Sequence, residues 1–160
     1  MGDEDGRAEW DRKYGQGLPS LTKPDPFFVS AYARFVAPAF PDAGTALDLA
    51  GGLGRHALWL AGRNWRVTVV DVSEVALGEL AREAARRKVA VQRHAGDAAA
   101  FPFYPGGYDL MVLFYHSDKT LFAKMVAALR PGGLVLCKLA VRWNVEATGA
   151  AAVGDPLDRG

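Results

Sequence analysis

The sequence LDLAGGLGR, at residues 47–55, decides the fold. It begins inside an apolar run at residues 45–50 that predicts a β-strand, and it ends where a helical pattern begins at residues 55–61. A glycine turn between a strand and a helix lets a ligand approach the backbone closely, and the helix presents free N–H groups to that ligand. The sequence therefore predicts a ligand-binding turn at residues 51–54, with a tight strand–helix connection without a ligand as the alternative.

Strands and helices alternate downstream of this turn. Apolar and β-branched runs predict further strands, at residues 66–71, 89–94, 108–114 and 134–141. Helical spacing predicts further helices, at residues 27–36, 74–88 and 121–129. Ser73 is placed to cap the second of these. The alternation predicts an α/β fold, a parallel sheet with helices on both faces, in which ligands bind at the carboxyl ends of the strands.

The composition excludes several classes of protein. The 160 residues are 50% hydrophobic and carry a net charge of +1, which suits one globular domain without a basic surface for nucleic acid. No apolar run reaches the roughly 18–20 residues of a membrane span, and the polar N-terminus does not resemble a secretory signal. The single cysteine, Cys137, and three histidines without a shared spacing predict no metal site. We expect a cytoplasmic protein.

The chain divides into three predicted segments. Residues 1–25 are charged and glycine-rich and predict an N-terminal loop or lid, although a single helical turn would place Trp10 and Tyr14 on one face. Residues 26–141 carry the α/β pattern and predict the ligand-binding domain. Residues 142–160 are rich in alanine and glycine, without a periodic pattern, and predict a flexible tail.

Aspartates at the ends of the predicted strands are candidate ligand contacts. Asp71 ends the second strand, where a carboxylate accepts hydrogen bonds from both hydroxyls of a ribose. Asp97 follows the third strand and can accept from an exocyclic amine such as adenine N6. Asp48 lies within the turn motif, where carboxylates would repel a pyrophosphate. The three carboxylates favour a nucleoside with an amino-acid tail over NAD, while a helix cap at Asp71 and an ordinary turn at Asp97 are the alternatives.

Five motifs carry a resemblance to a known family. They are LDLAGGLGR, VVDVS, AGDAAAFPF, YDLMVLFYHS and LRPGG, in this order. Their order and spacing resemble those of class I S-adenosylmethionine-dependent methyltransferases. With the opening EWDRKYG followed by PDPFF, residues 9–141 most resemble the small methyltransferases of the tellurite-resistance type. That family more often has cysteine where Gly51 stands.

The resemblance implies S-adenosylmethionine as the cofactor and in-line methyl transfer to a small-molecule acceptor. The implied cofactor contacts are Asp48, Ala50, Gly51, Gly52 and Gly54 for the methionine part, Asp71 and Val72 for the ribose, Asp97 and Ala98 for the adenine, Phe114 and Tyr115 at the methyl-transfer site, and Tyr14 closing over the cofactor. His116, just past the fourth strand, is a weak candidate for a catalytic base; a loop cap is the alternative.

The C-terminus departs from the family pattern. Class I sheets generally continue with a helix and an antiparallel hairpin, and residues 142–160 offer too few residues for both. We therefore expect a Rossmann-like sheet of order 3-2-1-4-5 whose C-terminal antiparallel strands are missing. Its fifth strand would be an apolar edge open to dimerisation or aggregation. The alternatives to an active methyltransferase are a cofactor-binding but inactive truncated domain and an NAD-dependent oxidoreductase, although no Tyr–Lys or His–Asp pair is evident for the latter.

Overall fold

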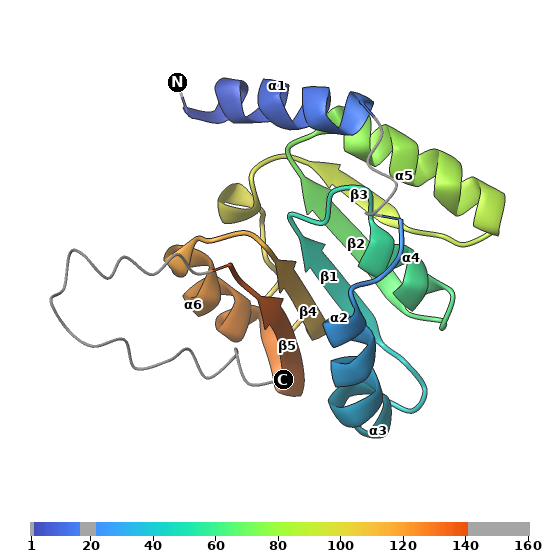
Figure 1. The fold of residues 1–160 in the computed structure, drawn as a ribbon. Helices are drawn as coiled ribbons and strands as arrows, with labels where there is room; N and C mark the ends of the chain where they lie inside the picture. The colour runs from blue at the N-terminus through green and yellow to red at the C-terminus, as the bar shows by residue number, and fades with distance from the viewer. Residues whose placement is uncertain (1, 17–21, 141–160) are drawn as a thin grey trace, which may run out of the picture.

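A five-stranded parallel sheet forms the middle layer of the protein (Figure 1). The computed structural model describes residues 2–16 and 22–140, without the side chains of residues 2–5. The strands are β1 (Thr45–Leu49), β2 (Arg66–Asp71), β3 (Gln92–Ala95), β4 (Tyr108–Phe114) and β5 (Leu129–Lys138). Their order is β3-β2-β1-β4-β5, and each neighbouring pair is parallel. The predicted sheet is confirmed; the predicted tail at residues 142–160 lies outside the described residues.

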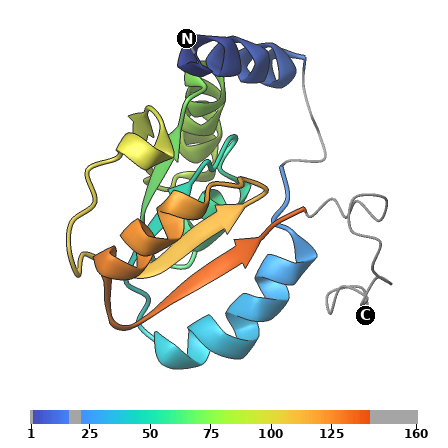
Figure 2. The same cartoon turned by 90° about the vertical axis from the view of Figure 1, so that its left-hand side faces the viewer.

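Helices cover both faces of the sheet (Figures 1 and 2). They are α1 (Gly2–Gly15), α2 (Pro26–Ala31), the π-helical turn η2 (Tyr32–Val36), α3 (Ala37–Ala39), α4 (Arg55–Ala61), α5 (Glu74–Arg87), the 3₁₀ turn η3 (Ala98–Ala100) and α6 (Lys119–Ala128). Residues of α2, α4 and α5 pack on one face, and residues of η3 and α6 pack on the other. None of the helices in the described ranges is long and apolar enough to cross a membrane.

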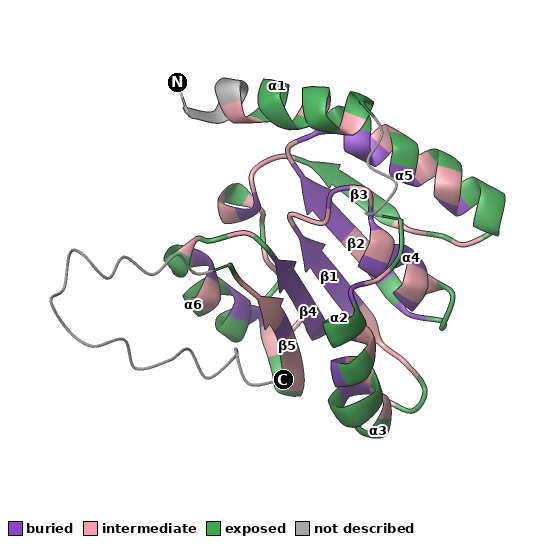
Figure 3. Ribbon diagram, in the orientation of Figure 1, coloured by how far each residue is buried: buried purple, intermediate pink, exposed green. Residues whose placement is uncertain are grey.

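Strand β4, which lies between β1 and β5, contributes residues to both cores. Leu110 and Val112 pack with α2, α4 and α5, whereas Met111 and Leu113 pack with α6. Every residue of β4 is buried, as expected for a parallel strand that is covered on both faces (Figure 3). In β5 only Leu136 is buried, because β5 lies at the edge of the sheet.

Two strands begin at residues other than those predicted. At the end of α5, Lys88 is left-handed, with φ of 56°, and the Val89 N–H donates to Ala84 O at 3.0 Å. Val89 therefore belongs to the helix end, and β3 begins at Gln92 rather than at residue 89. The fifth strand begins early, at Leu129, because a register shift between β4 and β5 accommodates the Pro-Gly-Gly sequence expected to precede it.

The N-terminal segment is the main correction to the prediction. Residues expected to form a loop form the 14-residue helix α1, which lies along α5 (Figure 1). The Arg7 Nε donates to Val72 O at 3.0 Å, and the Asp11 carboxylate accepts from Ser73 Oγ and from the Val75 N–H. Asp11 therefore adds a second acceptor to the N-terminus of α5, where Ser73 is the predicted cap and accepts from the Ala76 N–H at 3.0 Å.

Candidate cofactor site

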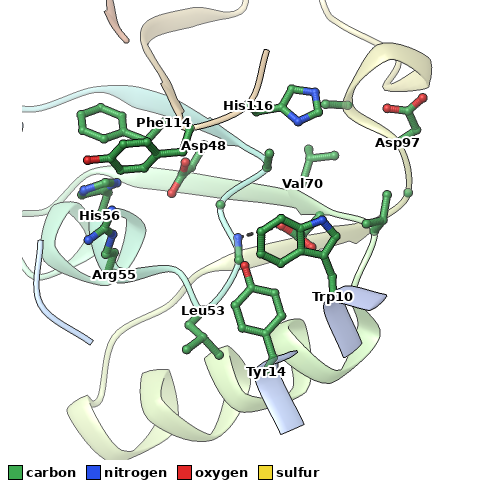
Figure 4. Close-up of a pocket in the computed structure, with 18 residues that line it drawn as sticks. Trp10, Tyr14, Asp48, Leu53, Arg55, His56, Val70, Asp97, Phe114 and His116 are labelled. Atoms are coloured by element: carbon green, nitrogen blue, oxygen red, sulfur yellow. Dashed lines mark hydrogen bonds between the residues drawn. The ribbon is translucent and has the colours of Figure 1, made fainter. Parts of the chain in front are cut away.

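A pocket of about 200 Å³ opens at the carboxyl ends of β1, β2 and β4 (Figure 4). Strand β1 pairs with both β2 and β4, so the pocket lies at the point where the strand order reverses, the usual ligand position in such sheets. The pocket brings together twelve of the thirteen residues predicted for the site, namely Tyr14, Asp48, Ala50, Gly51, Gly52, Asp71, Val72, Asp97, Ala98, Phe114, Tyr115 and His116.

The remaining predicted residue, Gly54, does not line this pocket. It is the N-cap of α4 with φ of 72°, a conformation that favours glycine. A Cβ atom at this position would meet the side chain of Leu80 on α5, with Cδ2 3.0 Å away. Gly54 therefore permits the close packing of α4 against α5 and shapes the turn without facing the pocket.

Asp71 ties the glycine turn to the end of β2. Its Oδ2 accepts from the Gly52 N–H at 2.8 Å, and its Oδ1 accepts from the Ser73 N–H at 2.9 Å. Burial raises the pKa of Asp71, although these two hydrogen bonds act in the opposite direction. Gly52 has φ of 57°, and a Cβ atom there would meet the Tyr14 hydroxyl. The turn thus requires glycine at position 52 on two separate grounds.

Asp48 carries the unsatisfied group of the pocket. Among the buried side-chain nitrogen and oxygen atoms of the described residues, only Asp48 Oδ2 has no hydrogen-bond partner. Burial, with the nearby charge of Asp71, raises the pKa of Asp48 to about 8. Buried polar atoms are nearly always hydrogen-bonded, so this oxygen is suited to a donor or a positive charge that a ligand brings.

Helix α1 covers one side of the pocket. The Trp10 and Tyr14 rings stack with their centroids 5.6 Å apart, and both line the cavity (Figure 4). Burial and the charge of Asp71 raise the pKa of Tyr14 to about 12, so this hydroxyl stays neutral. The sequence analysis singled out Tyr14 for the site, and only the four-residue spacing pointed to Trp10.

His56 is a pocket residue that the sequence analysis missed. It stacks against Phe28 and lies close to Phe114, with ring centroids 4.3 and 4.4 Å away. Its Nε2 accepts from the Asp25 N–H at 3.1 Å. Burial and the positive charge of Arg55 lower the pKa of His56 to about 3. His56 is therefore neutral and acts as a buried acceptor that fixes the backbone at Asp25.

Asp97 and His116 lie at the other end of the pocket from Phe114 and His56 (Figure 4). The Asp97 Oδ1 accepts from the Ala99 N–H at 3.0 Å and caps η3. Asp97 is therefore a turn aspartate, the alternative considered from the sequence, and it also lines the pocket. The remaining pocket residues that the sequence analysis did not single out are Leu53, Arg55, Val70 and Gly96. All four lie in motifs that carry the family resemblance, and Leu53 also lies in the predicted ligand-binding turn, but the sequence analysis assigned no role to these individual residues.

A hydrogen-bonded cluster around Asp25 lies behind the pocket wall, and of its members that bond to Asp25 Oδ2 only Tyr115 lines the pocket. The Asp25 Oδ2 accepts from the Tyr115 hydroxyl at 3.1 Å and from the Lys138 Nζ at 2.9 Å, and its Oδ1 accepts from the Phe27 N–H at 2.8 Å. Sequence reasoning named Tyr115 but neither Asp25 nor Lys138, because 113 residues separate this pair along the chain. Within the described ranges, no group of three or more His, Cys, Asp or Glu side chains could hold a metal ion.

Sequence comparisons identify the family of this domain. The family model described as a methyltransferase domain matches residues 46–133, more than half of the chain. The ubiquinone/menaquinone biosynthesis C-methyltransferase UbiE of Brucella suis is 30% identical over 119 residues. That alignment covers 67% of this chain and 44% of the relative, so the chain spans less than half the length of this curated relative.

Structural comparisons agree with the sequence match. Phosphoethanolamine N-methyltransferase 2 of Haemonchus contortus, solved with S-adenosylmethionine, has a TM-score of 0.58 at 26% identity over 68% of this chain and 27% of that one. Geranyl diphosphate C-methyltransferase of Streptomyces coelicolor has a TM-score of 0.68 at 18% identity, covering 91% and 67% of the two chains, and shares the fold. Together with the family match and the strand order, these likenesses show that the chain belongs to the class I S-adenosylmethionine-dependent methyltransferase family.

Proposed function

We propose that this protein transfers the methyl group of S-adenosylmethionine to a small-molecule acceptor. The observation that carries the proposal is the pairing of an unsatisfied, buried Asp48 oxygen with Asp71 in one pocket at the switch point of the sheet. A cofactor with an ammonium group at one end and ribose hydroxyls at its centre supplies what these two carboxylates need. A pyrophosphate brings neither a donor nor a positive charge for the unsatisfied Asp48 oxygen and would lie beside Asp71, which disfavours the NAD-dependent alternative.

The residues of the pocket fit the parts of this cofactor. Asp48 would face the ammonium of the methionine part, and Asp71 would accept from the ribose hydroxyls while it holds Gly52. Asp97 and Ala98 would lie at the adenine. Gly52, which has no room for a side chain beneath Tyr14, supplies the close backbone approach. Trp10 and Tyr14 would cover the cofactor, and Val72 would lie at the ribose, where the Arg7 side chain binds its carbonyl.

The main contribution of the protein to methyl transfer would be to position the acceptor against the methyl group of the cofactor. When bound, the cofactor supplies a methyl carbon that its cationic sulfur has already activated. Holding an acceptor in line with that carbon, in a site closed to water, can contribute about 7–11 kcal/mol to lowering the barrier. Aromatic faces such as those of Phe114 and Tyr115 can each add ~0.5–2 kcal/mol near a cation.

The resemblance to tellurite-resistance-type methyltransferases leads us to propose soft nucleophiles, thiols and oxyanions of tellurium or selenium among them. An inactive cofactor-binding domain remains the competing proposal, and no feature of the pocket favours it. A cytoplasmic location stays a prediction.

A turnover assay tests the proposal. The full chain is incubated with methyl-labelled S-adenosylmethionine and, separately, with thiols, oxyanions of tellurium and selenium, phenols and small amines. We expect acceptor-dependent transfer of the label with at least one class, and loss of transfer in Gly52→Val. Cofactor binding without transfer to any of these acceptors would favour the inactive domain instead.

A further inference from the structure

Tyr115 has an unusual backbone conformation. Its φ of 58° lies in the left-handed region, which a bulky side chain rarely adopts outside functional or strained sites. The Tyr115 N–H donates to Lys138 O at 2.7 Å, which continues the pairing of β4 with β5 by one residue. The backbone therefore turns sharply at the point where β4 reaches the pocket, and the turn directs the Tyr115 side chain to Asp25.

The Tyr115 side chain combines an anchored hydroxyl with an open ring. Its hydroxyl donates to the buried Asp25, yet the residue is 53% exposed and lines the pocket. The hydroxyl oxygen keeps lone pairs that can accept from a ligand. Tyr115 is therefore the member of the cluster that touches the pocket, whereas Asp25 and Lys138 lie behind it and are absent from the pocket wall.

Asp25 and Lys138 form a charged pair that is fixed from several sides. Burial by itself raises the pKa of Asp25, but hydrogen bonds from Lys138, the Phe27 N–H and Tyr115 outweigh it, so the pKa lies below its ordinary value. Hydrogen bonds to Tyr115 and Asp25 raise the pKa of Lys138. Both groups are therefore charged at neutral pH, and His56 holds the Asp25 backbone from behind.

We propose that Tyr115 is the catalytic residue on the acceptor side: its hydroxyl takes the proton from the acceptor's nucleophilic atom and passes its own proton to Asp25, while Lys138 holds both in position. The acceptor would be a neutral molecule whose nucleophilic oxygen or sulfur carries a proton, such as a phenol, an enol or a thiol. This assignment rests on the proposed methyl transfer and names the acceptor class for it.

The proposed step balances without a further reactant. A lone pair of the acceptor forms the bond to the methyl carbon, and the carbon–sulfur bond breaks with its electron pair left on sulfur. The acceptor's proton moves to Tyr115 Oη as the Tyr115 proton moves along the existing hydrogen bond to Asp25 Oδ2, and Asp25 later releases it to water. The acceptor proton becomes strongly acidic as the new bond forms, so a carboxylate is basic enough to receive it.

A binding experiment tests the role of Tyr115 without knowledge of the natural acceptor. Phenol and toluene, two rings of similar shape that differ in the hydroxyl, are titrated into the full chain with and without S-adenosylhomocysteine and followed by NMR. We expect phenol to bind about tenfold more tightly than toluene, the ratio that one hydrogen bond can supply. Tyr115→Phe should abolish this preference.

Matched variants separate a role in proton transfer from a role in folding. Tyr104→Phe removes the hydroxyl of an exposed tyrosine outside the pocket and should leave the preference unchanged. Lys138→Met should weaken the preference, and Lys138→Arg should retain most of it. Equal binding of phenol and toluene by the parent, or a preference that survives Tyr115→Phe, would overturn the assignment. Absent binding of S-adenosylhomocysteine would instead contradict the proposed function, so the two failures are distinguishable.

Turnover supplies the second readout. With any proton-bearing acceptor that the parent methylates, Tyr115→Phe should lower kcat about 100-fold, the smaller end of the range for a positioned acid–base group, with little change in KM. Asp25→Asn should lower kcat in the same way and flatten the acid limb of the pH profile. A parental kcat in Tyr115→Phe would overturn the assignment.

Discussion

Asp48 makes the stability of the protein depend on pH. Its pKa of about 8 in the folded protein lies above the ordinary value of 3.8, because burial and the charge of Asp71 disfavour the ionised form. Between these two values the folded protein holds a proton that the unfolded chain has released, so stability falls as the pH rises through this window. His56 has the opposite effect at lower pH, because its pKa is lowered from 6.5 to about 3 in the folded protein. Between these two values the unfolded chain binds a proton that the folded protein does not, so the free energy of unfolding decreases as the pH falls below 6.5.

Asp48→Asn should therefore stabilise the protein more at high pH than at low pH. We expect its gain in the free energy of unfolding over the parent to be larger by ~1 kcal/mol or more at about pH 8.5 than at about pH 5. Denaturant unfolding at the two pH values measures it. Asp42→Asn, at an exposed carboxylate, is the control and should show no such difference. A gain independent of pH would contradict the buried, protonated state of Asp48.

Gly52 should tolerate no side chain if a ligand crosses the turn. Gly52→Val places a β-branched residue at φ of 57° and a Cβ atom against the Tyr14 hydroxyl, so binding of S-adenosylhomocysteine should be abolished. Gly106→Val is a matched control, because Gly106 has φ of 62° with open space around it and lies outside the pocket. Calorimetry on both variants measures the difference. Unchanged affinity in Gly52→Val would mean that the ligand does not pass over this turn.

Among the individual site residues, those at the ends of strands could be predicted from the sequence, whereas those brought together only by packing could not. Asp48 and Asp71 could be predicted because short apolar strands fix their positions at the ligand edge of a parallel sheet. The contact between Asp25 and His56 spans 31 residues, and the contact between Asp25 and Lys138 spans 113. No local pattern encodes such contacts, so the cluster of Asp25, Tyr115 and Lys138 became visible only in the fold.

Among the elements, α1 is the one whose position matters most for the pocket. Its sequence did not predict a helix, because Gly6 and Gly15 disfavour helices and its apolar residues form no stripe beyond Trp10 and Tyr14. The helix is held by the Arg7 contact with Val72, just before α5, and by the Asp11 contacts with the N-terminus of α5. Tertiary contacts thus override local preference, as they also do where β5 extends through Pro-Gly-Gly.

Asp11→Ala should loosen α1 from α5. The variant loses the acceptor for Ser73 Oγ and for the Val75 N–H, and loss of a capping side chain costs about 0.5–2 kcal/mol. We expect faster amide hydrogen exchange in α1 and a roughly three- to thirtyfold weaker affinity for S-adenosylhomocysteine. Glu9→Ala, which breaks only the exposed ion pair with Lys13 on the same helix, is the control. Parental affinity in Asp11→Ala would show that α1 is no part of the site.

At the scale of the whole molecule, the sheet architecture was predictable from the sequence, and β5 forms one edge of that sheet. The strand order follows from the alternation of short strands and helices, and from the right-handed crossovers that parallel strands require. Among the described residues, β5 pairs only with β4, and the stretch Leu134 to Cys137 in its C-terminal half is apolar. Such an edge offers unpaired N–H and C=O groups to another chain.

We accordingly predict that the 160-residue chain dimerises or aggregates through β5. Light scattering over a dilution series measures the mass, and hydrogen exchange of β5 at the same concentrations should show protection that grows with concentration. Lys138 is the charged residue nearest to the apolar stretch and offers little protection against pairing. A monomer at ~100 μM, with β5 amides already fully protected, would contradict the prediction.

The central claim is that the pocket at the switch point binds S-adenosylmethionine, and calorimetry of the full chain tests it most directly. Titrations with S-adenosylmethionine, S-adenosylhomocysteine and NAD are compared for the parent and for Asp71→Asn, which keeps the shape of the side chain but leaves one acceptor oxygen for the Gly52 and Ser73 N–H groups. We predict binding of the first two ligands, no binding of NAD, and at least about a tenfold loss of affinity in Asp71→Asn, because charge-assisted hydrogen bonds to the ribose are lost. Tighter binding of NAD, or parental affinity for S-adenosylmethionine in Asp71→Asn, would contradict the account.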